Sequence, residues 1–270
     1  MGKTSPDTKP KTWRTALSRF SDESVEIAGY RHQDLMRAVD FAGMLFVLYQ
    51  QRLPEPAEAK LLNAVLVSVI DHSIVASSAV TRIVAASGVP LQASVAAGIL
   101  TIGDIHGGAG QELSRRLEEW VGEAERQKVA IADKARQVVQ ALRQKRERLE
   151  GYGHPLHPAG DARVDTLIAM ANELGLVGPH LQIALAISKE IEAATGKALP
   201  LNIDGVIAAI ASDLGFDWRL ARAFIFVPRA AGLAAHAIEE ATRERGWRKI
   251  ADPGDIEYDG PASREIGNTG

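Results

Sequence analysis

Three histidines stand at breaks between apolar segments, where a side chain that moves protons can be held close to a ligand. His72 follows one apolar segment, His106 lies in the glycine-rich stretch 103–110, and His154 lies in the loop 151–163. Imidazole changes its charge near neutral pH. Because breaks of this kind often converge on one cleft of a helical protein, the sequence predicts that these rings share a site.

The other candidate groups follow from what the chain lacks. It contains no cysteine, which excludes disulfides and thiolate chemistry. Neither a His-Glu-x-x-His pair nor a Gly-x-Ser-x-Gly elbow occurs, so we predict no metal site and no serine hydrolase. Histidine with Asp204 remains for proton transfer, and Arg163 and Arg229 can hold carboxylates by paired hydrogen bonds. The remaining histidines are interpreted as surface or structural groups: His32, His157, His180 and His236.

The loop 151–163 is dense in glycine, proline, histidine and charge. Gly151 and Gly153 allow the backbone to approach a ligand, and Asp161 stands where it can cap a following helix. These features fit a ligand-binding loop and also an ordinary helix-to-helix linker. The basic residues before it, including Arg146, favour a solvated helix end, with phosphate contact as the alternative.

Composition narrows the class of protein. The 270 residues carry a formal net charge of -3, from 31 basic and 34 acidic side chains that are not segregated by sign. We therefore expect no nucleic-acid partner. The start of the chain lacks a signal-peptide apolar run, and no stretch approaches the ~18 apolar residues of a membrane span. These observations favour a soluble, cytoplasmic protein.

Helical spacing dominates the apolar pattern, which predicts a mostly α protein. The segments 74–87 and 90–103 are small and apolar almost all round, so we expect closely packed helices in the interior. Residues 1–12 should form a flexible arm, the tail from residue 250 should be extended, and Pro228 should kink or restart its helix. The expected helices cover residues 33–49, 57–70, 74–87, 90–103, 111–125, 129–150, 162–174, 179–195, 205–214 and 217–244.

Five motifs, in order, resemble those of the citrate synthase superfamily, and the similarity runs from about residue 13 to residue 258. They are Asp71-His72; Ala97-Gly98-Ile99 with Ile105-His106-Gly107-Gly108; Gly151-Tyr152-Gly153-His154 with Gly160-Asp161-Ala162-Arg163; Asn202-Ile203-Asp204; and Pro228-Arg229-Ala230-Ala231-Gly232 with Ala235-His236. Each motif alone is weak, but the ordered set is specific.

Details lean toward the citryl-CoA lyase branch, which includes the lyase module of ATP-citrate lyases. The chain is short, it reads Leu100-Thr101-Ile102-Gly103-Asp104, and Gly205 stands where synthases usually have an aromatic residue. Two features depart from this pattern. His106 matches the synthases, whereas the ATP-citrate lyase module is expected to have phenylalanine. The tail reads Ala251-Asp252-Pro253-Gly254-Asp255, without the arginine that synthases supply from the partner subunit.

The resemblance implies an all-α fold with the active site in the cleft between two domains. The large domain would comprise residues 13–108 and 206–270, and the small, CoA-binding domain residues 109–205. It also implies a homodimer or a higher homo-oligomer, joined by helix packing that agrees with the alanine-rich region 74–103.

Roles for individual residues follow only from the resemblance. Asp204 would be the general base or acid, His106 would donate to the thioester oxygen, and His154 would polarise the ketone of oxaloacetate. The substrate's other oxygens would be held by His72, Arg163 and Arg229. Coenzyme A would lie across the loop, contacting Gly151, Tyr152, Gly153 and Arg146.

These roles describe a citryl-CoA lyase that makes or breaks the bond between acetyl-CoA and oxaloacetate, without a metal. Citrate synthase, which also hydrolyses the thioester, and a related 2-oxoacid condensing enzyme remain alternatives. A weakly active CoA-binding relative is a further alternative, because the third arginine is missing.

Overall fold

The computed structural model describes residues 13–20, 24–153, 160–244 and 246–266. The expected arm at residues 1–12, the predicted site residue His154 and the histidine interpreted as a surface or structural group, His157, lie outside these ranges.

Helices make up most of the described chain, as the sequence predicts. They are α1 (His32–Ala38), α2 (Phe41–Gln50), α3 (Pro56–Ser68), α4 (Ala76–Ala86), α5 (Leu91–Leu100), α6 (Ala109–Gln127), α7 (Ile131–Lys145), α8 (Ala162–Glu173), α9 (Pro179–Thr195), α10 (Ile203–Asp213) and α11 (Ala223–Arg243), with short 3-10 turns η1 (Trp218–Leu220) and η2 (Pro253–Asp255).

A small antiparallel sheet near the N-terminus was not predicted. Its strands are β1 (Ser18–Phe20), β2 (Val25–Ile27) and β3 (Tyr30–Arg31), in the order β1-β2-β3. Strands of two or three residues are too short to produce a recognisable alternation of apolar and polar positions.

Three expected helices differ clearly in extent from the observed ones. The helix expected over 129–150 ends at Lys145, because Arg146 adopts a left-handed backbone conformation (φ 53°) that caps it. The helix expected over 33–49 is divided into α1 and α2, because the Asp40 side chain accepts a hydrogen bond from the Gly43 amide (2.7 Å) and starts a new helix. The helix expected over 217–244 begins only at Ala223 and continues through Pro228. Pro228 lies in the second turn, where its missing N–H removes a single hydrogen bond.

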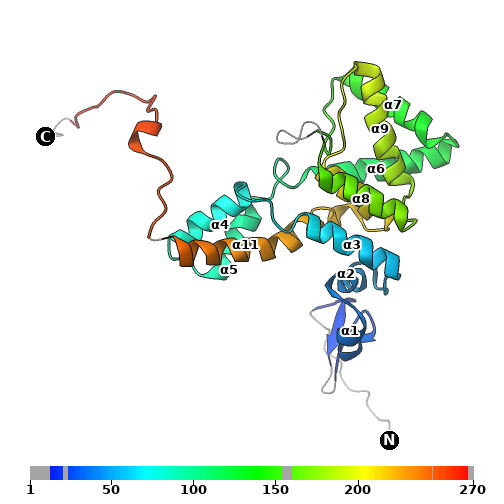
Figure 1. Ribbon diagram of the computed structural model, residues 1–270, viewed down its shortest axis with the longest axis horizontal. Coiled ribbons are helices and arrows are strands. Elements are labelled where there is room, and N and C mark those ends of the chain that lie inside the picture. The colour runs from blue at the N-terminus through cyan, green and yellow to red at the C-terminus, as the bar shows by residue number, and fades with distance from the viewer. Residues whose placement is uncertain (1–12, 21–23, 154–159, 245, 267–270) are drawn as a thin grey trace, which may run out of the picture.

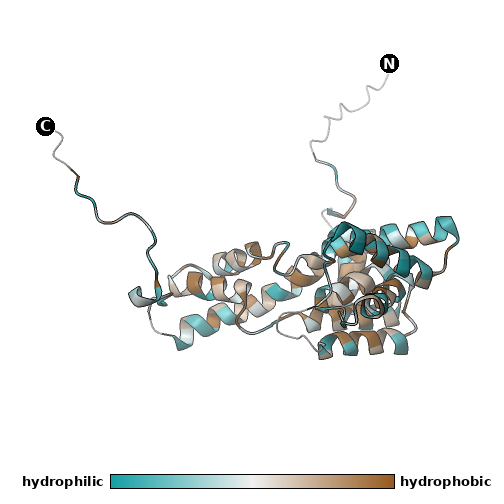
Figure 2. Ribbon diagram, turned by 90° about the horizontal axis from the view of Figure 1, so that it is seen from above, coloured by the Kyte–Doolittle hydropathy of each residue, from teal (hydrophilic) through white to brown (hydrophobic). Residues whose placement is uncertain are grey.

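The helices form a block and a projecting lobe (Figure 1). Helices α6, α8 and α9 pack around α10, whose residues 205–212 are all buried, and α7 packs against α9 and α6. Helices α4, α5 and α11 pack against one another in the lobe, and α3 contacts both α8 and α11. Apolar residues face inward between the helices of the block, while α6 and α7 present polar outer faces (Figure 2).

The prediction that 74–87 and 90–103 are buried almost all round is wrong for the single chain. Their buried residues are mainly small, such as Ser77, Ser94 and Gly98, where the three helices approach closely. Leu91 and Leu100 are instead 43% and 85% exposed, because the lobe offers them no further helix to pack against. The expected domain boundaries stay predictions.

Candidate active site

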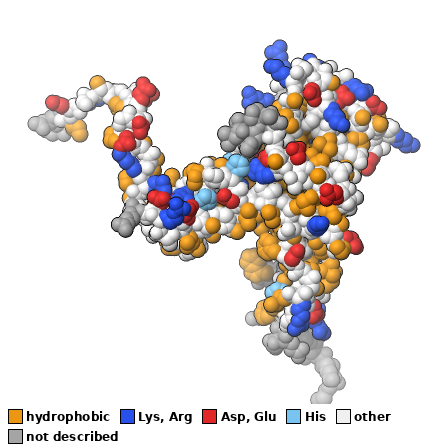
Figure 3. All heavy atoms as spheres, in the orientation of Figure 1, with side chains coloured by type: hydrophobic (Ala, Val, Ile, Leu, Met, Phe, Trp, Pro, Cys, Tyr) orange, Lys and Arg blue, Asp and Glu red, His pale blue; other side chains and the backbone are white. Residues whose placement is uncertain are grey.

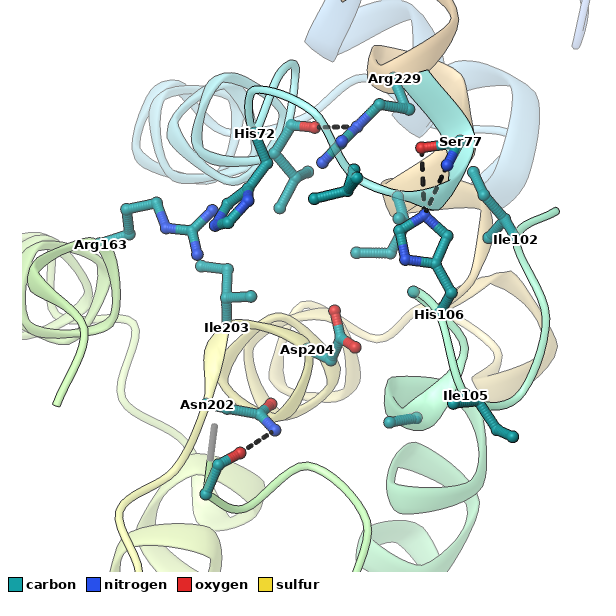
Figure 4. A pocket seen from close by; sticks show the side chains of 16 residues that line it. His72, Ser77, Ile102, Ile105, His106, Arg163, Asn202, Ile203, Asp204 and Arg229 are labelled. Carbon is teal, nitrogen blue, oxygen red and sulfur yellow. Dashed lines mark hydrogen bonds between the residues drawn. The ribbon is translucent and has the colours of Figure 1, made fainter. Parts of the chain in front are cut away.

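A cavity of about 340 Å³ lies where the ends of several helices meet (Figure 4). The segment after α3, the start of α4, the turn between α5 and α6, and the starts of α8 and α10 all reach it, together with α11. The lining residues are Val69, His72, Val75, Ser77, Ile102, Ile105, His106, Gly107, Ala109, Gly153, Arg163, Asn202, Ile203, Asp204, Ile225 and Arg229.

Most of the predicted chemistry therefore meets in one place. His72, His106, Arg163, Asp204 and Arg229 all line the cavity, although they come from segments far apart in the sequence. In Figure 4 the side chains of Asp204 and His106 project into the same space. This arrangement agrees with the expected convergence of helix ends. The role of each residue stays a prediction.

Asp204 is the second residue of α10, and its backbone is fixed from both sides. The Asn202 side chain caps the helix by accepting from the Gly205 amide (3.0 Å), and its amide nitrogen donates to the Gly153 carbonyl (2.9 Å). A Cβ at Gly205 would lie only 2.2 Å from the Gly151 carbonyl oxygen. The start of α10 thus rests directly on the loop, which leaves Asp204 little freedom.

The surroundings of Asp204 favour its protonated form. Burial raises the pKa of its carboxyl, while the positive charges of Arg163 and Arg229 act in the opposite direction and only in part offset the burial. No hydrogen bond from any described residue reaches this carboxyl. A carboxyl with a raised pKa is suited to exchange a proton with carbon.

His106 is held in one orientation and one tautomer. Its Nε2 lies 3.3 Å from the Ser77 backbone nitrogen and 3.1 Å from the Ser77 hydroxyl. Because an amide N–H only donates, Nε2 accepts, and the ring proton belongs on Nδ1. Burial, with the nearby charges of Arg229 and His72, lowers the pKa of His106, so the neutral ring presents an N–H donor. No local pattern in the sequence marks Ser77 for this contact.

Arg229 offers a buried donor to the cavity. Only 7% of the residue is exposed, and its Nε donates to the Val69 carbonyl (2.9 Å). Its Nη1 is buried and has no hydrogen-bond partner in the described part of the chain. Leaving a buried donor unpaired costs free energy, so this atom suits an incoming anion.

Arg163 is paired before any ligand binds. Its Nη2 lies 2.6 Å from the Asp161 carboxylate, and its Nη1 donates to the Ser68 carbonyl (3.3 Å). Asp161 caps α8 as the sequence predicts, but its second role as a partner of Arg163 was missed. Both arginines thus donate to backbone carbonyls at the end of α3: Arg163 to Ser68, the last residue of the helix, and Arg229 to Val69, the residue after it.

The residues expected to bind coenzyme A divide between two places. Gly153 borders the cavity, whereas Tyr152 is buried and donates from its hydroxyl to the Ala184 carbonyl (2.9 Å). The Gly151 carbonyl accepts from the Asn202 amide (2.9 Å). Arg146 lies outside the cavity and lines a second hollow, of about 360 Å³, which Tyr152 also lines.

The tail does not line the cavity. Residues 246–266 are exposed except for the part-buried Arg248, and they lead away from the lobe (Figure 1). Asp252 and Asp255 cap η2, and Lys249 is paired with Asp252. The acidic residues that replace the missing arginine are therefore remote from the site within one chain.

A metal-binding cluster and a membrane-spanning helix are both absent from the described residues. No set of three or more histidine, aspartate or glutamate side chains is grouped there as a metal ion would require. No helix in those ranges has both the length and the apolar character that crossing a bilayer demands.

Known proteins share this fold and this sequence pattern. The family described as "Citrate synthase, C-terminal domain" matches residues 11–250. Citrate synthase 2 of Bacillus subtilis (strain 168) is 30% identical over 215 residues, which cover 79% of this chain and 54% of that protein. The chain thus spans about half the length of this relative.

Solved structures extend the comparison. The citryl-CoA lyase from Hydrogenobacter thermophilus is 37% identical with a TM-score of 0.87, over 95% of this chain and 98% of that one. The ATP citrate lyase from Methanothrix soehngenii, solved with citrate and coenzyme A, is 26% identical with a TM-score of 0.79, over 96% and 43%. The chain belongs to the citrate synthase family, and the expected family and all-α fold are confirmed.

Proposed function

We propose that the protein cleaves citryl-CoA reversibly into acetyl-CoA and oxaloacetate. The observation that carries this proposal is the unpartnered, buried Nη1 of Arg229, in the same cavity as Asp204. A cationic donor that awaits an anion, beside a carboxyl with a raised pKa, fits a carboxylate substrate that exchanges a proton at carbon. The similarity to a citryl-CoA lyase over nearly the whole of both chains supports the same reaction.

In the cleavage direction a base takes the proton of the citryl hydroxyl, and we assign that role to His154. As the alkoxide becomes the ketone of oxaloacetate, the carbon–carbon bond breaks and its electron pair passes to the acetyl-CoA enolate. The Nδ1–H of His106 stabilises the enolate oxygen. Asp204 then gives its proton to the enolate carbon, which completes acetyl-CoA.

The carboxylates of the substrate are assigned to His72, Arg163 and Arg229. Both arginines are already oriented by carbonyls at the end of α3. A planar guanidinium can bind a carboxylate through two parallel hydrogen bonds, which fixes the acid relative to Asp204.

Coenzyme A is assigned to the loop 151–153 and to the neighbouring hollow. Arg143, Arg146 and Arg148 line that hollow, so basic groups are available there for phosphate. Arg146 has a positive φ of 53°, which glycine adopts without strain. Calorimetric titration of an Arg146→Gly variant with coenzyme A tests this assignment, because the variant loses the cation and keeps the backbone. Unchanged affinity would remove Arg146 from the site.

We also propose that the chain forms a homo-oligomer through the lobe of α4, α5 and α11. Side chains coloured as apolar lie along this lobe in Figure 3. Four large apolar side chains on the lobe and on the segment before α4 are 43–85% exposed: Ile74, Leu91, Leu100 and Ile238. Several exposed apolar side chains on one group of helices are typical of a surface that another subunit covers.

Two assays on the purified protein test the reaction. The first follows citryl-CoA cleavage by the appearance of oxaloacetate. The second follows free thiol release from acetyl-CoA with oxaloacetate. We expect rapid cleavage in the first assay and little thiol in the second. Rapid, stoichiometric thiol release would show a citrate synthase instead. Coenzyme A binding with no turnover in either assay would show a weakly active CoA-binding relative.

A further inference from the structure

One face of α11 is in contact with the segment that carries His72 into the cavity. Arg229, Gly232 and His236 follow the spacing i, i+3 and i+7, which places them on one side of the helix. Each of them meets a different residue of the run 69–71. Of these three residues, the proposed function assigns a substrate contact only to Arg229.

The first two contacts fix the backbone of this segment. The Arg229 Nε donates to the Val69 carbonyl (2.9 Å). At Gly232, an added Cβ would lie only 2.1 Å from the Ile70 carbonyl oxygen, so the segment touches the helix backbone itself. No side chain larger than hydrogen fits at Gly232 unless the segment moves.

The third contact joins His236 to Asp71, the residue before His72. The His236 Nε2 lies 2.9 Å from the Asp71 Oδ1, while its Nδ1 lies 3.2 Å from the Arg82 Nη1. A guanidinium only donates, so Nδ1 accepts and the ring proton belongs on Nε2. His236 therefore donates to Asp71, whose other oxygen accepts from the Ser73 amide (3.0 Å).

Arg82 cannot swing away from His236. Its Nε lies 2.7 Å from the Glu240 carboxylate, and its Nη1 lies 2.6 Å from that of Glu239. Arg248 lies on the far side of Glu240, at 2.6 Å. Glu240 is 1% exposed and Arg82 is 8% exposed, so solvent screens the ion pair between these two residues little. Because Arg82 donates to Nδ1 of His236, the ring proton stays on Nε2, where it is donated to Asp71.

We propose that His236 is a positioning residue: by holding Asp71 it sets the backbone of His72, and with it the affinity of the site for the 2-oxoacid. This inference rests on the proposed function, which assigns His72 to the oxygens of oxaloacetate. His236 does not line the cavity, so it acts through Asp71 and touches no substrate.

Two substitutions of His236 separate positioning from general stability. The side-chain amide of His236→Gln offers N–H donors and a carbonyl acceptor and can replace both hydrogen bonds of the neutral ring, whereas His236→Leu offers neither. The matched control is His180→Leu, because His180 Nδ1 lies at the same 2.9 Å from the Asp213 carboxylate, at the start of α9. Asp71→Ala removes the other partner of the contact.

Oxaloacetate and coenzyme A are titrated separately into each variant. We expect His236→Leu to weaken oxaloacetate binding about threefold, because the Asp71 side chain is 46% exposed and solvent weakens its contact with His236, and to leave coenzyme A binding unchanged. His236→Gln and His180→Leu should bind oxaloacetate as the natural chain does. Combining Asp71→Ala with His236→Leu should cost little more than either change alone. Additive losses, an equal loss in His180→Leu, or no loss in His236→Leu would overturn the proposal.

A second measurement needs no ligand. Hydrogen exchange of residues 69–73 should be faster in His236→Leu than in the natural chain, and unchanged in His236→Gln and His180→Leu. Unchanged exchange in His236→Leu overturns the positioning role. If the natural chain binds no oxaloacetate, the proposed function fails. Hydrogen exchange then still decides whether His236 orders residues 69–73 or not.

Discussion

At the residue scale, the site depends most on the proton that Asp204 exchanges. Asp204→Asn keeps the shape of the side chain and removes the acid. A positioned general acid or base contributes about 10²- to 10⁴-fold in rate, so we expect citryl-CoA cleavage to fall by that factor. Circular dichroism should show an unchanged helical fold. Retention of more than about a tenth of the activity would exclude Asp204 as the acid.

The same substitution should change how stability depends on pH. Burial raises the pKa of Asp204 in the folded protein, with Arg163 and Arg229 opposing in part. Such a group stabilises the fold fully below its unfolded pKa of about 3.9, and that contribution is lost as pH rises through the folded pKa. Asparagine does not ionise. We therefore expect the Tm of Asp204→Asn, relative to that of the natural chain, to rise progressively between about pH 4 and about pH 7. A Tm difference independent of pH would contradict the raised pKa.

The limit of what the sequence could predict also shows at single residues. Asp204, His106 and Arg229 were found because unusual residue types stand at breaks or within ordered motifs. Ser77 and the carbonyls of Ser68 and Val69 could not be found, since a small residue in an apolar helix or a backbone oxygen leaves no pattern. Their roles arise only when distant segments meet.

At the element scale, periodicity predicted the long helices well. α6 and α9 differ from the expected ranges by only two residues or fewer at each end. The division into α1 and α2 was missed because the Asp40 cap lies within continuous apolar spacing. The exposed faces of α4 and α5 were missed because apolar character alone does not say whether a neighbour lies within the chain or in another one.

The close approach of α4, α5 and α11 depends on Gly98. An added Cβ there would lie 2.0 Å from the Thr81 hydroxyl and 2.8 Å from the Ser77 carbonyl. We expect Gly98→Ala to destabilise the protein by about 1–3 kcal/mol through overpacking. Chemical denaturation measures this change.

The control is Gly122→Ala in α6, where the nearest atom is the flexible tip of Arg126, at 3.2 Å. A helical alanine there should stabilise the fold by up to about 1 kcal/mol. Equal effects at both glycines would mean that the packing at Gly98 is not tight.

At the scale of the whole molecule, the projecting lobe should mediate assembly. Leu100 on α5 is 85% exposed, so Leu100→Lys places a charge on the proposed interface. We expect sedimentation to show a smaller species than the natural chain forms, because burying an unpaired charge in an interface is costly. Phe20→Lys on β1 is the control, since Phe20 is 84% exposed but lies away from the lobe. If both variants sediment alike, another surface joins the subunits.

The end of α3 has a thermodynamic consequence for the whole site. Arg163 and Arg229 come from different helices, α8 and α11, yet both donate to carbonyls of neighbouring residues, Ser68 and Val69. Freezing a mobile side chain on binding costs about 0.5–1.5 kcal/mol of conformational entropy. Both guanidinium groups are already ordered in the folded protein, so this cost does not arise when the acid binds. The acid meets two cations at a fixed spacing, and little of its binding free energy is spent on ordering them.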